Sequence, residues 1–223
     1  MIKLLVQVFG FILPWSLRRR LLTACFGYHL HPECRIGLSF LFADAVVLAK
    51  GARLGHLNYI GRLDMLQMDE DSLIGNFNWI AGFSTQIETP FFKSAKNRRS
   101  QLTMGKCSMM GHQHYIDCTD SVTFGAFSGL AGFRSQLVTH GVEIIRSKQT
   151  CAPIVVGEYT MVGAGSLLMK GVNIPKACII SAGTVINYIK AEPYSLIAGN
   201  PAECTRKVPE TAKLFARTSS VIY

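Results

Sequence analysis

Residues 152–175, "APIVVGEYTMVGAGSLLMKGVNIP", decide the fold because an aliphatic side chain recurs at every sixth position. These positions are Val156, Val162, Leu168 and Ile174. A period of six matches neither the helical period of about 3.6 residues nor the alternation of a half-buried strand. Units of this length, each a short strand and a turn, stack three to a coil in a parallel β-helix. The aliphatic side chain fills the coil, and the small residue that often follows fits the tight corner.

The same period extends through most of the chain. It begins at Ile36, slips in register near residues 70 and 120, resumes after residue 153 and continues to Ile186. Its further members are Ile36, Phe42, Leu48, Leu54, Ile60, Leu66, Ile74, Ile80, Ile116, Phe124, Leu130, Ile180 and Ile186. The pattern predicts an all-β chain with a parallel β-helix over residues 36–205.

Two polar stretches interrupt the repeat. The first is residues 86–101, "QIETPFFKSAKNRRSQ", which carry a proline and a cluster of basic side chains. The second is residues 140–153, which begin at His140. We expect both to project from the coils as loops, where solenoid proteins usually place their binding functions.

Composition limits the classes of partner. The 223 residues are 49% hydrophobic and 17% charged, which argues against a disordered chain. A net charge of +9 suits a polyanionic partner such as a membrane surface or a phosphate-rich cofactor. The basic residues are dispersed rather than interleaved with aromatics on one face, so no nucleic acid is expected. Seven cysteines without a CxxC pair are typical of reduced thiols in a cytoplasmic protein.

Residues 1–35 are expected to form an amphipathic helical segment. The apolar run at residues 4–13 is too short to span a bilayer, and a cluster of three arginines at 18–20 argues against an export signal. Two interpretations stay open: a helix lying at the inner membrane face, or a helix that caps the repeat domain. Residues 206–223 are expected to form a tail with a short C-terminal helix.

Three motifs carry a family resemblance. "THGVEI" at 139–144, the repeats at 152–175 and "SLIAGNPAECTRKV" at 195–208 resemble the left-handed β-helix, hexapeptide-repeat acyltransferases. That group includes galactoside, maltose and xenobiotic acetyltransferases and polysaccharide-modifying enzymes. The resemblance covers about residues 36–208. It implies a left-handed coil, a homotrimer with active sites between subunits, and acetyl-CoA as co-substrate.

The resemblance also implies roles for individual residues. His140 falls on the catalytic histidine, a general base for the acceptor hydroxyl or amine. Ala164 falls where a backbone N–H meets the thioester oxygen, and Ala182 lines the pantetheine channel. Arg206 matches an arginine that meets CoA phosphates, with Lys207 assisting it. Asn187 stands where some relatives carry a threonine near the channel.

Three further residues have two interpretations each. His112 and His114, two apart, would share a face of a strand and either bind the acceptor or form a hydrogen-bonded turn pair. Glu143, three residues after His140, either orients the imidazole or is a solvated loop acid. A γ-carbonic-anhydrase-like zinc site built from His112, His114 and His140 is a rival, but that class lacks the "AGNPA" ending. No metal is therefore expected.

The expected function is O-acetyl transfer from acetyl-CoA to a sugar, within cell-surface polysaccharide biosynthesis. The expected acceptor is a sugar or lipid-linked saccharide, and the expected location is cytoplasmic with peripheral contact at the inner membrane face. The alternative class is a non-enzymatic trimeric scaffold built from the same repeats.

Overall fold

The structure, a computed structural model, describes residues 2–93, 95 and 97–220 of the chain. Met1 of the expected N-terminal segment, Ser94 and Lys96 of the expected first loop, and residues 221–223 of the expected tail lie outside the described residues.

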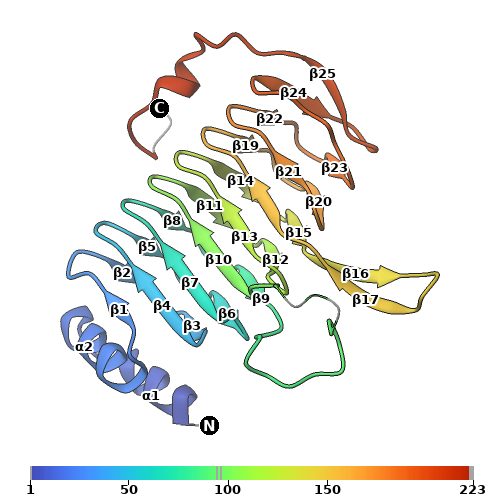
Figure 1. The fold of residues 1–223 in the computed structure, drawn as a ribbon. Coiled ribbons are helices and arrows are strands. Elements are labelled where there is room, and N and C mark those ends of the chain that lie inside the picture. Colours follow the sequence, from blue (N-terminus) through green and yellow to red (C-terminus); the bar gives the residue numbers. More distant parts are fainter. Residues whose placement is uncertain (1, 94, 96, 221–223) are drawn as a thin grey trace.

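The described chain winds as a triangular prism of three sheets, in which every strand pairing except that of β25 (Glu203–Lys207) is parallel (Figure 1). Sheet A contains β1 (His29–Leu30), β4 (Ala45–Leu48), β7 (Met65–Met68), β10 (Gln101–Met104), β13 (Val122–Phe124), β18 (Ile154–Val156) and β21 (Asn173–Ile174). Sheet B contains β2 (Arg35–Ile36), β5 (Arg53–Leu54), β8 (Leu73–Ile74), β11 (Met109–His112), β14 (Gly129–Phe133), β19 (Met161–Val162), β22 (Ile179–Ile180), β24 (Ser195–Ala198) and β25 (Glu203–Lys207). Sheet C contains β3 (Phe40–Phe42), β6 (Tyr59–Gly61), β9 (Trp79–Ala81), β12 (Tyr115–Asp117), β15 (Gln136–Val138), β20 (Leu167–Met169) and β23 (Val185–Ile186).

One aliphatic side chain from each short strand fills the prism. On sheet C, the register places Ile60 beside Ile80 and Ile80 beside Ile116, and all three side chains are fully buried. Burial follows the six-residue period of the sequence because every coil returns the same position to the same height on its face. The prediction of a left-handed parallel β-helix is confirmed.

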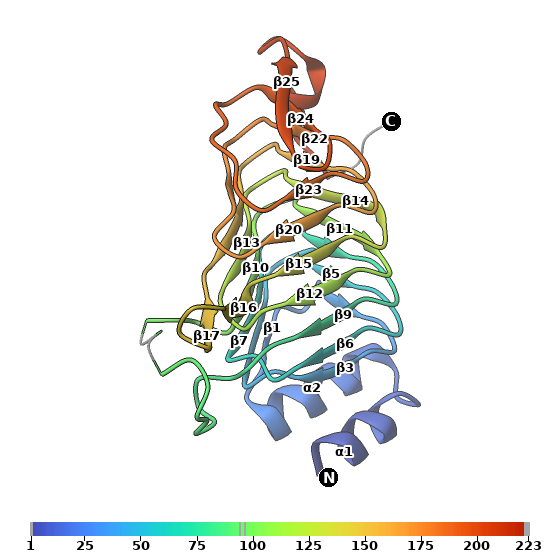
Figure 2. The ribbon, with the colours of Figure 1, turned by 90° about the vertical axis from the view of Figure 1, so that its right-hand side faces the viewer.

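Two helices within the described residues close the lower end of the prism, α1 (Ile2–Gly10) and α2 (Trp15–Phe26) (Figures 1 and 2). The amide of Gln7 bonds both backbone groups of Leu41, at 2.9 and 2.7 Å. The Arg18 guanidinium donates to the carbonyl of Gly37 at 2.9 Å. The helices thus cap the first coil, as one of the two interpretations expected.

The first coil begins earlier than the expected boundary at residue 36. Helix α2 ends before Gly27, whose φ of 68° provides the left-handed cap. Strand β1 follows at once and pairs with β4. The sequence concealed this strand because it is only two residues long and precedes the first aliphatic–glycine pair.

Two insertions leave the corner at which sheet C passes into sheet A. We call this the C–A corner: residues 43–44, 62–64, 82–100, 118–121, 139–153 and 170–172. Residues 82–100 form a long loop, and β16 (His140–Glu143) pairs antiparallel with β17 (Lys148–Cys151) as a hairpin. Figure 2 shows both on the same side of the prism.

The last described segment folds back over the prism. Strand β25 turns antiparallel to β24, and the short C-terminal helix is a 3-10 turn, η1 (Lys213–Ala216). The Arg217 guanidinium then lies 5.6 Å from the Tyr159 ring centroid and donates to the carbonyl of Phe127. Within the described residues, no helix has the length and apolar character needed to cross a bilayer.

A pair of neighbouring substitutions tests the inward packing. Leu54, 2% exposed, points into the prism, whereas Arg53 on the same strand is exposed. We expect Leu54→Ala to lower the free energy of unfolding by about 2–5 kcal/mol because it leaves a cavity. Arg53→Ala is expected to change it by less than about 0.5 kcal/mol. Urea denaturation measures both, and equal effects would contradict the packing described.

Candidate active site

His140 lies at the C–A corner, directly after β15, and its imidazole faces a carboxylate. Its Nδ1 is 2.7 Å from Oδ2 of Asp117, and its backbone N–H donates to the same oxygen at 3.1 Å. The Thr119 hydroxyl lies 3.4 Å from Nδ1. About a third of the His140 side chain is exposed, at 34%, so the ring is held on one edge and open on the other.

Asp117 occupies an outward position at the end of β12, in register with Ala81 and Val138 on the adjacent strands. It is 6% exposed, and neighbouring donors satisfy both carboxylate oxygens. The Thr119 hydroxyl donates to Oδ1 at 2.6 Å, and the Thr139 backbone N–H donates to Oδ2 at 2.8 Å. Such a carboxylate is fixed in orientation before any substrate arrives.

The two pKa shifts follow from this geometry. Burial alone would raise the pKa of Asp117, but hydrogen bonds from His140, Thr119 and Thr139 outweigh it and hold the pKa below its ordinary value. The hydrogen bond to Asp117 raises the pKa of His140, against partial burial and the nearby charge of Lys170. With Asp117 ionised and the imidazole neutral, Nδ1 carries the proton and Nε2 offers its lone pair.

A hollow of about 280 Å³ opens beside His140 on the outer surface of sheet C. Its floor contains small residues, its walls contain aromatic rings, and one arginine stands at its rim. The lining residues are Tyr59, Arg62, Trp79, Ala81, Gly82, Phe83, Tyr115, Asp117 and His140. The Tyr59 and Trp79 rings stack with centroids 4.4 Å apart, which makes the aromatic wall continuous across two coils.

The long loop covers the other side of the imidazole. The rings of Phe83 and Phe92 meet the His140 ring edge to face, at centroid distances of 6.4 and 6.0 Å. Arg98 donates to the carbonyls of Phe83 and Thr119 and ties the loop to the corner. These contacts shield the imidazole on the side of the loop.

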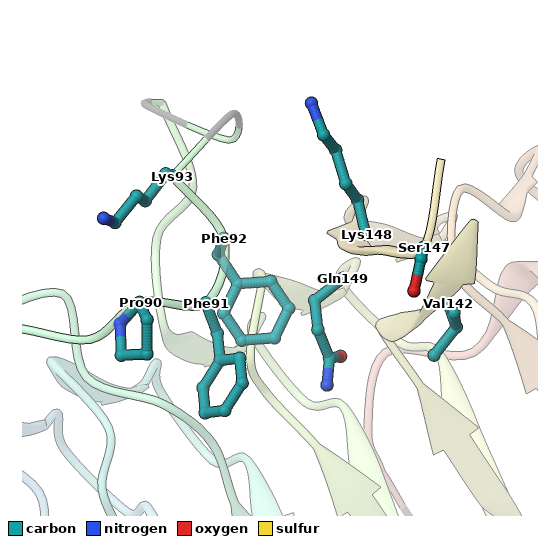
Figure 3. A pocket seen from close by; sticks show the side chains of 8 residues that line it. All are labelled: Pro90, Phe91, Phe92, Lys93, Val142, Ser147, Lys148 and Gln149. Carbon is teal, nitrogen blue, oxygen red and sulfur yellow. The ribbon is translucent and has the colours of Figure 1, made fainter. Parts of the chain in front are cut away.

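A second hollow, of about 530 Å³, separates the loop from the hairpin (Figure 3). Pro90, Phe91, Phe92 and Lys93 line it from the loop, and Val142, Ser147, Lys148 and Gln149 line it from the hairpin. Phe92 borders both this hollow and His140. The corner therefore has room for a large ligand on either side of the loop.

Ala164 and Ala182 lie at a different corner, where sheet B passes into sheet C. We call this the B–C corner: residues 37–39, 55–58, 75–78, 113–114, 134–135, 163–166 and 181–184. Among the described residues, no acceptor pairs with the Ala164 N–H, although its carbonyl accepts from Gly183. Ala182 is exposed. In one chain, these residues and His140 stand at opposite edges of sheet C.

The remaining cofactor candidates lie toward the upper end of the prism. Asn187 is exposed just after β23, and Arg206 is exposed on β25. The ammonium of Lys207 pairs with the carboxylate of Glu192 at 2.7 Å. Phosphate binding by Lys207 would therefore compete with this surface ion pair.

Glu143 does not hold the imidazole. Its carboxylate lies 3.9 Å from Arg146 within the hairpin, and Asp117 makes the contact with His140. Spacing along the chain suggested Glu143, whereas stacking of coils brings in a residue from the preceding turn. The available signal was an acidic residue after Ile116, in the register where other coils carry Gly61 or Ala81.

The other two candidate histidines, His112 and His114, form hydrogen bonds with the backbone of the B–C corner. His114 is 1% exposed, and its Nδ1 accepts the Ser135 backbone N–H at 3.1 Å. Burial lowers the pKa of His114 to about 4. Nδ1 of His112 accepts from the Asn76 backbone at 2.9 Å. Neither residue lines the hollow beside His140, and within the described part of the chain no three His, Cys, Asp or Glu side chains gather into a metal-binding group.

Known proteins resemble this chain in part of its sequence and in its fold. No protein-family model matches the chain. Over 75 residues it is 33% identical to "Putative acetyltransferase YJL218W" of Saccharomyces cerevisiae, a match that covers 32% of this chain and 37% of that protein. The matched stretch thus spans little more than a third of the curated relative's length.

Solved structures cover more of the chain at lower identity. The polysialic acid O-acetyltransferase OatWY superimposes with a TM-score of 0.64 and 14% identity, over 81% of this chain and 84% of OatWY. The Bacillus cereus N-acyltransferase AntD, solved with dTDP and coenzyme A, gives 0.52 and 10% identity, over 86% and 89%. The Vibrio cholerae hexapeptide-repeat acetyltransferase VCA0836, solved with acetyl coenzyme A, gives 0.50 and 15%, over 93% and 85%. The chain therefore has the fold of the hexapeptide-repeat acetyltransferases.

The link between Asp117 and His140 can be measured without substrate. We expect Asp117→Asn to lower the pKa of His140, because the charged partner of the imidazolium is removed. Glu143→Gln is the control and should leave that pKa unchanged. NMR titration of the imidazole C2 proton measures both, with circular dichroism to confirm folding. An unchanged pKa in Asp117→Asn, or an equal fall in Glu143→Gln, would contradict the assignment.

Proposed function

We propose that the protein is an acetyl-CoA-dependent O-acetyltransferase whose general base is His140, oriented by Asp117. One observation carries the proposal: a partly exposed imidazole fixed by a buried carboxylate opens onto a hollow at a corner of a hexapeptide-repeat acetyltransferase fold. That geometry provides a base with its Nε2 lone pair directed away from its orienting partner.

The proposed reaction is a direct transfer. Nε2 of His140 takes the proton of an acceptor hydroxyl as the oxygen bonds to the thioester carbonyl carbon. The Ala164 N–H of a second subunit donates to the developing oxyanion. The carbon–sulfur bond then breaks, the imidazolium returns the proton to the CoA thiolate, and an acetyl ester and free CoA result. Asp117 stabilises the imidazolium throughout and stays ionised. An acceptor amine would follow the same course.

A homotrimer would unite the two corners. His140 and Ala164 stand at opposite edges of sheet C, so one chain does not bring them together. Large apolar side chains are exposed on the Ala164 side: Leu38, Leu57 and Phe77 at the B–C corner, and Phe133 at the end of β14 just before it. A second copy packed there would bury these side chains and bring its own C–A corner toward Ala164 and Ala182. Arg206 and Asn187 would then be available to the CoA nucleotide.

We further propose a sugar acceptor in cell-surface polysaccharide biosynthesis. The aromatic wall of the hollow offers faces on which the apolar side of a sugar ring can pack. Ile2 and Leu5 on helix α1 and Ile12 in the turn after it are exposed. This suits peripheral contact of a cytoplasmic enzyme with the inner membrane face, where lipid-linked saccharides are built.

Removing the base tests the proposal. We expect His140→Ala to reduce acetyl transfer by about 10²–10⁴-fold with coenzyme A binding retained. In the wild type, kcat/KM should rise with pH and level off above the raised pKa of His140, because only the neutral imidazole accepts a proton. In Asp117→Asn, this limb should move to lower pH with a lower plateau. Thiol release in a screen of sugars with acetyl-CoA measures these rates, and near-full activity of a folded His140→Ala would refute the proposal.

Mixed subunits test where the site lies. Ala182→Trp should block the pantetheine channel, because Ala182 is exposed and a large side chain there projects outward. A homotrimer of Ala182→Trp and a homotrimer of His140→Ala should each be inactive. Co-expressed with different tags, the two variants should form hybrid trimers in which some sites join His140 of one subunit to Ala182 of another. Restored activity is expected, and its absence in verified hybrids would place the site within one chain.

A further inference from the structure

Arg62 is a charged side chain at the mouth of the hollow beside His140. In the part of the chain that the structure describes, no ion pair of the fold depends on it. It lies at the C–A corner between β6 and β7, is exposed, and has a φ of 59°. Its guanidinium lies 5.9 Å from the ring centroid of Phe83, which holds it at the rim of the same hollow as His140. Stacking on an aromatic ring leaves the donor fork of a guanidinium free in its plane.

Within the described residues, Arg62 forms no ion pair. Two carboxylates near Arg62 are already engaged: Asp64 on the same turn and Asp117 in the same hollow. Asp64 accepts from the hydroxyls of Ser84 and Thr85, both at 2.7 Å, and Asp117 is committed to His140. Arg98 shows the contrast, because its guanidinium donates to carbonyls of the corner. Arg62 is thus an unpaired cation facing the space an acceptor would enter.

The rest of the hollow suits a ring with one polar and one apolar face. Trp79 and Tyr115 are about half exposed, at 49% and 48%, and stand on neighbouring strands of sheet C. Ala81, on the same strand as Trp79, adds only a methyl group to the floor of the hollow. A pyranose packed on the rings would present hydroxyls toward His140 and a charged substituent toward Arg62.

We propose that the acceptor is an anionic saccharide, and that Arg62 binds its carboxylate or phosphate while a hydroxyl of the sugar approaches His140. This rests on the proposed acetyltransferase function and adds the charge class of its acceptor. A guanidinium makes bidentate, charge-assisted hydrogen bonds with either oxyanion, so both sources fit the same site.

The chain offers a control of the same charge. Arg53 is an exposed arginine on β5 of sheet B, outside both the C–A corner and the B–C corner. It does not line the hollow beside His140. Arg62→Gln and Arg53→Gln therefore remove the same charge, one inside the proposed site and one outside it.

Direct binding tests the inference apart from catalysis. Ligand-observed NMR on the full chain, with no acetyl-CoA, would compare N-acetylneuraminic acid, glucuronic acid and glucose 6-phosphate with glucose and N-acetylglucosamine. We expect the acidic sugars to bind more tightly than the neutral ones, and Arg62→Gln to weaken their binding by about tenfold. Arg53→Gln should match the wild type, and Arg62→Lys should fall between wild type and Arg62→Gln. Comparison of the two carboxylate sugars with glucose 6-phosphate identifies which oxyanion the site prefers.

The outcomes separate this inference from the proposed function. Equal binding of acidic and neutral sugars, no detectable binding of any acidic sugar, or equal losses in the two glutamine variants would overturn the role of Arg62. Arg62-dependent binding without His140-dependent transfer to any sugar would uphold the anionic site and contradict the acetyltransferase proposal.

Discussion

The vertical stacking of one inward aliphatic side chain per six-residue unit is the constraint on which the rest of the structure depends. Each coil must return Ile60, Ile80 and Ile116 to the same line, because only then is the interior filled without voids. Once the inward column is fixed, every other position also recurs in a column. Residues that are about twenty positions apart in sequence become neighbours, and a site can be assembled from successive turns.

The pairing of Asp117 with His140 follows from that geometry. Asp117 ends β12 just before the C–A corner, and His140 lies in that corner on the next coil. Thr119 and Thr139 beside them supply the donors that make a buried carboxylate tolerable. The long loop and the hairpin leave the prism at the same corner, so aromatic rings reach the imidazole without disturbing the coils. The rigid stack thus sets the geometry of the base, and the insertions shape its surroundings.

The sequence predicted the fold well because the six-residue period is long and each unit repeats the same physical requirement. It also singled out His140, where the period ends in an insertion. It could not identify Asp117, because contacts between coils depend on the register at each corner, which slips twice along the chain. Distance along the chain made Glu143 a candidate to orient the imidazole, but Glu143 pairs with Arg146. His114 had two interpretations, acceptor binding or a hydrogen-bonded turn, and its ring accepts a backbone hydrogen bond in the buried corner.

A crystal structure of the protein with coenzyme A tests the central claim most directly, because it locates the reacting sulfur. We expect a trimer in which the CoA sulfur lies close to Nε2 of His140 from one subunit and to the Ala164 N–H of its neighbour, with the nucleotide toward Arg206. Coenzyme A bound away from His140, or no binding at saturating concentration, would contradict the assignment of this corner as the active site.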